Sequence, residues 1–186
     1  MPDGRFFVMA LLAAAAVVVS AIWPPMIEQW RGMIEQAAVR RSIDPALIAA
    51  IIWTESGGMP DAVRHEPSFG VSSYGLMQIA SFDWRPVPEL LLDPAFNVEF
   101  GARMLAQIIG LADGDMRLAL AAYNCGFEGV RVNRCGKWGG YVYADKVLVK
   151  CAEFGGACLG KYRDEDWSLE CENLPTANLS FGSHFC

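Results

Sequence analysis

A single carboxylate closes an otherwise apolar stretch of the chain, and its position could give it acid–base chemistry. Glu55 follows residues 47–52, in which Leu and Ile recur at helical spacing. It comes four residues after Ile51 and three after Ile52, so it continues the apolar stripe of the predicted helix. Unless it is paired, a carboxyl group there is driven towards its neutral form by desolvation. A neutral acid can donate a proton to a bound molecule.

Residues with capping chemistry mark both ends of this predicted helix. Asp44 and Pro45 form a helix-start pair, because the Asp side chain can accept from free backbone N–H groups and Pro fits the first helical position. Gly57 and Gly58 form a natural stop. The sequence therefore places the carboxylate at a helix end that opens into a glycine turn.

The rest of the chain predicts an α+β, mainly helical domain with one short non-helical insert. Residues 59–74 are rich in Pro, Gly and Ser and have no helical period, so we expect a loop or a small β-hairpin beside a cleft. Helical spacing recurs elsewhere. The predicted helices are one from Pro24 through Ala37, one after Asp93-Pro94, one from Asp115 to Asn124-Cys125-Gly126, and one from Tyr141 towards Lys150 with Val142, Lys146 and Val149 along one side.

The amino terminus has the features of an export signal. Arg5 precedes an apolar run from residue 6 to residue 23, and Val19-Ser20-Ala21 offers small residues to a signal peptidase. We expect a signal peptide over residues 1–21, and an uncleaved membrane anchor is the alternative. Both interpretations export the rest of the chain to the periplasm or cell envelope. They leave a catalytic domain over residues 24–150 and a Cys-rich tail, residues 151–186, packed on it as loops.

The cysteines and the net charge restrict the remaining possibilities. All six cysteines lie in the C-terminal third, and an even count after a signal sequence indicates three disulfides, with fifteen pairings open. A zinc site is the alternative, but the chain has no C-x-x-C pair and only two histidines. We therefore expect no metal. The net charge of −6 gives no reason to expect a nucleic-acid partner.

Several short motifs together resemble the soluble lytic transglycosylases of the bacterial cell wall. The main segments are Glu55-Ser56-Gly57-Gly58, Gly75-Leu76-Met77-Gln78-Ile79, and Ala122-Tyr123-Asn124 followed by Gly126. Supporting residues are Asp93-Pro94, Asn97, Gly101, and Tyr143 followed by Lys146-Val147. The resemblance covers roughly residues 27–150. It implies a lysozyme-like fold that cleaves the β-1,4 bond between N-acetylmuramic acid and N-acetylglucosamine without water, leaving a 1,6-anhydro sugar.

The resemblance also implies roles for individual residues. Glu55 matches the catalytic acid, which protonates the leaving oxygen and then takes the proton from the C6 hydroxyl. No cofactor is implied, because the substrate's N-acetyl group can replace a second carboxylate. Asn124 would hold the N-acetyl group, although a helix C-cap is the alternative, and Tyr143, rather than Tyr141, would aim the acid. The implied substrate-binding set is Ser56, which touches the substrate or holds the loop, Met77, Gln78, Tyr123, Asn124 and Tyr143.

Two other functions remain open from the sequence. A goose-type lysozyme hydrolyses glycan on the same fold, but its Gly-Leu-Met-Gln segment continues with an apolar residue and Asp. Here Ile79 is followed by Ala80, so Asp61 or Asp83 would have to substitute. A non-catalytic wall-binding or assembly protein is the other alternative. In each case the expected partner is the peptidoglycan glycan strand, and secretion, conjugation or phage machinery are candidate further partners.

Overall fold

Helix α3 (Pro45–Ser56), which contains Glu55 in its last turn, is enclosed by the rest of the fold. The computed structural model describes residues 23–67, 70–82, 85–132, 134–137 and 139–158. Every residue of α3 from Ala46 to Ile52 is buried. This helix is contacted by α1 (Pro25–Glu28), α2 (Arg31–Arg41) and α7 (Gly140–Glu153). The apolar stripe predicted from the sequence is therefore only part of its buried surface, because neighbours cover it on several sides.

The predicted caps of α3 are confirmed. The Asp44 side chain accepts a hydrogen bond from the Ala46 amide at 2.9 Å, and Pro45 is the first helical residue. Gly57 follows the last turn in the left-handed conformation, with φ of 62°. Local capping chemistry thus fixes where the helix begins and ends, and it places Glu55 in the last turn.

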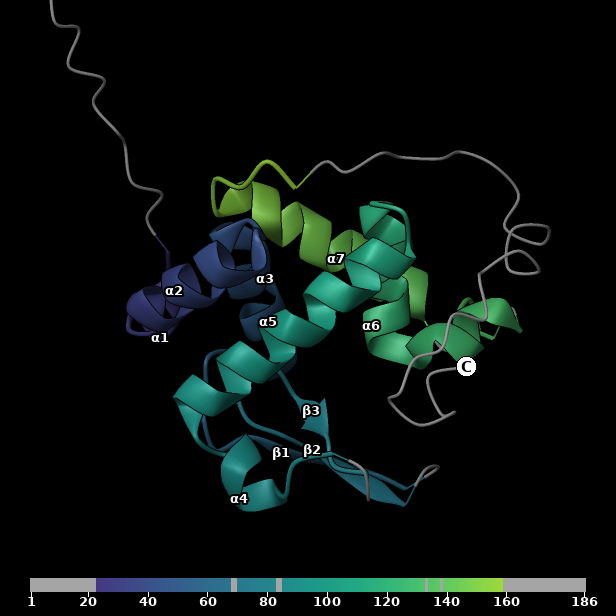
Figure 1. The fold of residues 1–186 in the computed structure, drawn as a ribbon, viewed down its shortest axis with the longest axis horizontal. Helices are drawn as coiled ribbons and strands as arrows, with labels where there is room; N and C mark the ends of the chain where they lie inside the picture. Colours follow the sequence, from purple (N-terminus) through teal and green to yellow (C-terminus); the bar gives the residue numbers. More distant parts are fainter. Residues whose placement is uncertain (1–22, 68–69, 83–84, 133, 138, 159–186) are drawn as a thin grey trace, which may run out of the picture.

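A three-stranded antiparallel sheet forms the insert. Strand β1 (Val63–Glu66) pairs with β2 (Val71–Tyr74), which pairs with the short β3 (Ile79–Ala80). The predicted hairpin is therefore confirmed, with a third strand added from the second motif. The sheet and helix α4 (Pro88–Leu91) form the lower part of the view in Figure 1, and the other helices lie above them. The expected mainly helical α+β class is confirmed.

The N-terminal segment differs from its prediction. Where one helix is predicted, the structure has α1 (Pro25–Glu28) and α2 (Arg31–Arg41), with a turn between them. The Trp30 indole donates to the Gly58 carbonyl at 3.0 Å. The turn thus places a large side chain against the glycine turn that follows α3, and this long-range contact is invisible to helical periodicity.

The later helices follow their predicted positions, but α6 (Met116–Arg131) extends past its predicted end. Helix α6 kinks at Gly126, whose φ of 75° and ψ of 155° are not helical, and the chain then continues as helix to Arg131. In α7 (Gly140–Glu153) the predicted side of Val142, Lys146 and Val149 is exposed, while Ala144 and Val147 are buried. Small residues allow close contact with α6 and α3. The bounds are α5 (Pro94–Leu111), α6 (Met116–Arg131) and α7 (Gly140–Glu153).

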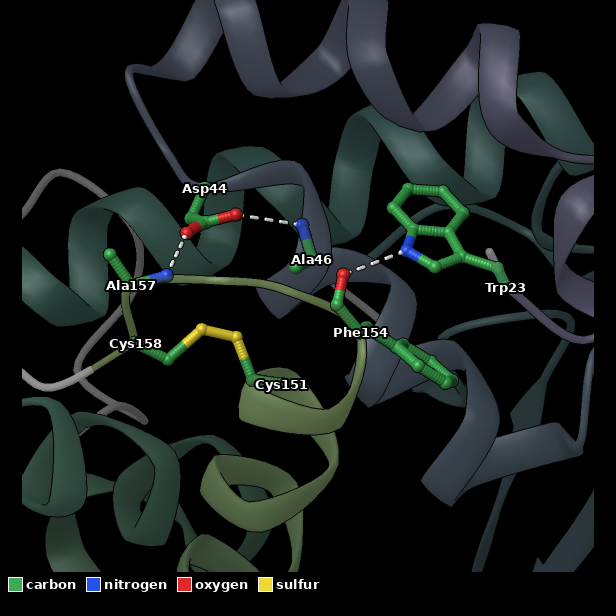
Figure 2. The surroundings of a disulfide bond; sticks show 7 residues. All are labelled: Trp23, Asp44, Ala46, Cys151, Phe154, Ala157 and Cys158. Carbon is green, nitrogen blue, oxygen red and sulfur yellow. Dashed lines mark hydrogen bonds between the residues drawn. A yellow bond between two sulfur atoms is a disulfide. The ribbon is translucent and has the colours of Figure 1, made fainter. Parts of the chain in front are cut away.

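The chain after α7 is fastened to the N-terminal part of the domain, as Figure 2 shows. A disulfide joins Cys151 to Cys158, and the Trp23 indole donates to the Phe154 carbonyl at 3.1 Å. The Ala157 amide donates to Asp44 at 2.8 Å. The two hydrogen bonds join segments more than 100 residues apart in the sequence, and the disulfide closes the short loop that makes them.

A second disulfide joins Cys125 to Cys135, and the remaining two cysteines lie outside the described residues. The predicted signal peptide and most of the predicted tail, from residue 159 onwards, also lie outside them. Among the described residues, no helix has the length and apolar character needed to cross a bilayer.

Asn97, fully buried on α5, connects the sheet, α4 and the second motif. Its amide nitrogen donates to the carbonyls of Tyr74 and Leu91, at 2.9 and 2.7 Å. Its amide oxygen accepts from the Met77 backbone N–H at 2.7 Å. One side chain therefore satisfies three main-chain groups where the insert meets the helices.

We predict that Asn97→Ala lowers the free energy of unfolding by roughly 3 kcal/mol or more, because each buried partner left unsatisfied costs about 1–3 kcal/mol. Urea unfolding measures this change. The matched control is Gln107→Ala, an exposed position on the same helix, which should change stability by less than about 0.5 kcal/mol. Equal losses in the two variants would contradict the role assigned to Asn97.

Candidate active site

Glu55 lies at the junction of α3, the sheet and the two C-terminal helices. Its side chain is only 8% exposed. Arg64 on β1 contacts it, and the hydroxyl group of Tyr143 on α7 lowers its pKa. The charge of Glu55 in turn raises the pKa of Tyr123 on α6. The residue that the sequence singles out is therefore buried among groups from three other elements, and it does not point into bulk solvent.

Burial gives this carboxyl group an unusual acidity. Desolvation raises the pKa of Glu55 from an ordinary 4.5 to about 7. The Tyr143 hydroxyl and the positive charge of Arg64 oppose this effect and lower the pKa, whereas the negative charge of Glu66 raises it. A pKa near neutrality lets one group donate a proton and later accept one.

The two tyrosines differ in how they are held. The Tyr123 hydroxyl donates to the Met77 carbonyl at 2.9 Å. The Tyr143 hydroxyl is buried and influences the Glu55 pKa, but it has no hydrogen-bond partner of regular geometry among the described residues. Desolvation raises the pKa of both phenols well above the ordinary value, so both remain neutral near Glu55.

The Gln78 side chain is fixed by hydrogen bonds to two backbone carbonyls. Its amide nitrogen donates to the carbonyls of Ala62 and Gly75, each at 3.0 Å. Its φ of 48° is in the left-handed region, which is uncommon for a residue with a side chain. Because the nitrogen is already engaged, the amide oxygen is the group that Gln78 can offer to a ligand. It is thus an acceptor rather than the donor and acceptor expected from its type.

Ser56 and Met77 serve the architecture of the site. The Ser56 hydroxyl donates to the Leu76 carbonyl at 2.8 Å and accepts from the Gly58 amide at 3.2 Å, so it ties the end of α3 to the second motif. The Met77 side chain is fully buried, and a Cβ at Gly101 would overlap its sulfur. Of the two roles expected for Ser56 the structure supports holding the loop, and it places the Met77 side chain in the core.

Asn124 has a different position from the other predicted site residues. It is exposed on α6, two residues before the kink at Gly126, and the helix runs through it. Because two helical stretches meet at this kink, both the substrate contact and the helix C-cap expected for Asn124 stay predictions. Its neighbour Cys125 is bonded to Cys135, which braces this turn.

Sequence reasoning missed the charged pair on β1 that acts on the acid. Arg64 and Glu66 are two residues apart on a strand, so they lie on the same face of the sheet. The strand alternation was a usable signal, but the sequence alone does not show that this face meets the end of α3. Among the described residues, no cluster of three or more His, Cys, Asp or Glu side chains could hold a metal ion.

Comparison with known proteins agrees with this arrangement. The family model described as the transglycosylase SLT domain matches residues 32–144, which is more than half of the chain. The chain belongs to this family. The match contains Glu55, the second motif, the third motif and Tyr143, so the resemblance inferred from these motifs is confirmed.

Individual members of the family are similar over part of their length. The chain is 35% identical over 85 residues to the endo-type membrane-bound lytic murein transglycosylase A of Salmonella paratyphi B and of Salmonella typhimurium. That match covers 42% of this chain and 42% of each relative, so it spans less than half of their length. An inactive mutant of the lytic transglycosylase Slt from Pseudomonas aeruginosa has a similar fold, with a TM-score of 0.55 and 24% identity over 67% of this chain and 24% of that chain.

The raised pKa of Glu55 predicts a pH-dependent gain in stability for Glu55→Gln. The folded state holds the proton more tightly than the unfolded state, so the wild-type free energy of unfolding falls as pH rises from 4.5 to about 7. Gln cannot lose a proton. The variant should therefore match wild type at about pH 4 and exceed it by up to about 3 kcal/mol at about pH 8.

Urea unfolding of both proteins at the two pH values measures this gain. Asp61→Asn, at an exposed position on the insert, is the control and should show no such trend. A constant difference between Glu55→Gln and wild type across the pH range would contradict the raised pKa.

Proposed function

We propose that this protein is a peptidoglycan lytic transglycosylase that uses Glu55 as its single acid and base. It would cleave the β-1,4 bond between N-acetylmuramic acid and N-acetylglucosamine and leave 1,6-anhydro-muramic ends. The observation that carries the proposal is the buried carboxyl of Glu55, whose pKa is raised to about 7 by desolvation. Membership of the transglycosylase SLT domain family supports it.

The reaction would proceed in two proton transfers through one side chain. Neutral Glu55 gives its proton to the glycosidic oxygen as the bond from that oxygen to C1 of the muramic residue breaks. The positive charge that develops at C1 is stabilised by the carbonyl of the substrate's own N-acetyl group. The C6 hydroxyl oxygen then bonds to C1, and Glu55 takes the hydroxyl proton. The acid is regenerated, and no water is consumed.

The surrounding polar groups would bind and orient the glycan. Gln78 would accept a hydrogen bond from a sugar hydroxyl or amide through its free oxygen, and exposed Asn124 would hold the N-acetyl group. Tyr143, whose buried hydroxyl faces Glu55, would donate to the carboxylate once the proton has left. Tyr123 would contribute to the same wall while it fixes the Met77 carbonyl.

We also propose that the protein acts in the cell envelope, with its N-terminal segment as an export signal that places it in the periplasm or as an uncleaved membrane anchor. Supporting this are the sequence of residues 1–21, the disulfides, which suit an oxidising compartment, and Salmonella relatives described as membrane-bound. Its partner would be the glycan strand. Secretion, conjugation or phage machinery are the candidate settings that such an exported enzyme would serve.

Digestion of purified peptidoglycan tests this function directly. Wild type should release muropeptides with 1,6-anhydro-muramic ends, identified by mass spectrometry. Glu55→Gln should lower the rate by about 100-fold or more, because the acid–base group is lost while the shape of the side chain is kept.

Asp61→Asn separates the proposal from its alternatives. Asp61 is exposed, so its loss should leave the anhydro products and their rate unchanged. Reducing ends that require Asp61 would instead establish a lysozyme-like hydrolase. A protein that binds glycan and releases no product would be a wall-binding module, and the proposal would fail.

A further inference from the structure

One guanidinium group contacts both the main chain and the side chain of the acid. Arg64 Nη2 donates to the Glu55 backbone carbonyl at 3.1 Å. Arg64 Nη1 lies 3.7 Å from Glu55 Oε2. The Arg64 side chain is 52% exposed, whereas that of Glu55 is 8% exposed. Arg64 therefore lies over the buried acid from the side of strand β1.

We infer that Arg64 is a positioning residue for Glu55, which holds the acid at its main chain and its carboxyl together and eases the return of the carboxyl to its charged form. The inference rests on the proposed function, because Glu55 is the acid and base of that reaction. It adds a residue from β1 to a site otherwise built from the motif segments.

The hydrogen bond from Arg64 to the Glu55 carbonyl is favourable because it lies at the C-terminal end of α3. The carbonyl of Glu55 is among the last four of the helix, which have no intrahelical N–H partner. A cation is favoured there by the helix dipole. The planar, forked guanidinium has several donors, so it can reach the carbonyl with one nitrogen and the carboxylate with another. A Lys ammonium group also has several donors, but it is a compact point charge without this planar fork.

Among the described residues, Tyr143 and Arg64 both oppose the effect of burial on Glu55, and Arg64 does so through its positive charge. Tyr143 from α7 and Tyr123 from α6 are neutral phenols, and the charge of Arg85 acts on Tyr123. Glu66, on the same strand as Arg64, acts in the opposite direction. Position 64 therefore favours the carboxylate, and position 66 favours the neutral acid.

This arrangement matters most in the second half of the proposed reaction. Glu55 must exist as a carboxylate to take the proton from the C6 hydroxyl. Without Arg64 the Glu55 carboxylate would be less stable, and its carboxyl group would lose the contact with the guanidinium. The pH at which Glu55 loses its proton would rise, and the rate of a correctly protonated enzyme would fall.

The test compares Arg64→Gln, Arg64→Lys and Glu66→Gln in the full chain, with soluble glycan strands as substrate. The pH dependence of kcat/KM is measured for each variant. In Arg64→Gln the fall of kcat/KM on the alkaline side should move to a pH about half a unit higher, which is the shift that a partly exposed ion pair can produce. Its kcat should fall about 10-fold through lost orientation. Glu66→Gln is the matched control on the same strand, and its alkaline fall of kcat/KM should move to lower pH.

Arg64→Lys separates charge from geometry and replaces Arg64→Gln if that variant does not fold. Lys keeps the positive charge, so the alkaline fall of kcat/KM should stay near the wild-type pH while kcat remains reduced. Thermal unfolding of each variant identifies losses caused by misfolding. The inference would be overturned if the alkaline fall of kcat/KM stays at the wild-type pH in Arg64→Gln but moves in Glu66→Gln. A wild-type kcat in Arg64→Lys would also overturn it.

Carboxyl-carbon NMR titration of Glu55 gives a readout that does not depend on activity. The midpoint should be higher in Arg64→Gln than in wild type, and lower in Glu66→Gln. If wild type releases no anhydro products, the proposed function fails, and the titration still decides whether Arg64 acts on Glu55. If products form and the midpoint is the same in Arg64→Gln and wild type, the inference fails alone.

Discussion

The burial of one carboxyl group is the constraint on which the rest of this structure depends. Glu55 ends a helix enclosed by α1, α2 and α7, and its side chain is almost closed to water. Keeping a carboxylate there is unfavourable, so the fold accepts a destabilised charge at neutral pH. The neutral phenol of Tyr143 and the half-exposed cation of Arg64 lessen the effect of burial on Glu55 but do not remove it. Tyr123 is a second neutral phenol near the acid.

The segment that follows the hairpin shows how most residues of a motif can serve a site through their main chain. Asn97 binds the Met77 N–H, Tyr123 binds the Met77 carbonyl, and Ser56 binds the carbonyl of Leu76. Three helices thereby hold one short piece of main chain. The fixed backbone then allows Gln78 to adopt its left-handed conformation and to present one amide oxygen. Most residues of this motif therefore fix the main chain, and the Gln78 amide oxygen is the group that can be offered to a ligand.

Local chemistry was predictable from the sequence, and long-range contacts were not. The caps of α3, the hairpin and the acid follow from residue types and spacing over a few positions. The turn before α2 depends on the contact of Trp30 with a carbonyl 28 residues away. The buried face of α7 depends on which small residues meet α6. Arg64 and Met77 show the two complementary errors, because a strand residue without a motif contacts the acid while a motif residue lies in the core.

Asp44 performs two tasks with its two carboxylate oxygens. One caps the first turn of α3 at Ala46, and the other accepts from Ala157, 113 residues later, in the loop closed by Cys151 and Cys158. When that loop opens, or when the first turn of α3 frays, the Asp44 carboxylate therefore loses one of its two hydrogen bonds. The two ends of the domain form a single cooperative unit of local unfolding, and the covalent link after α7 helps to protect the amides of the helix that carries the acid.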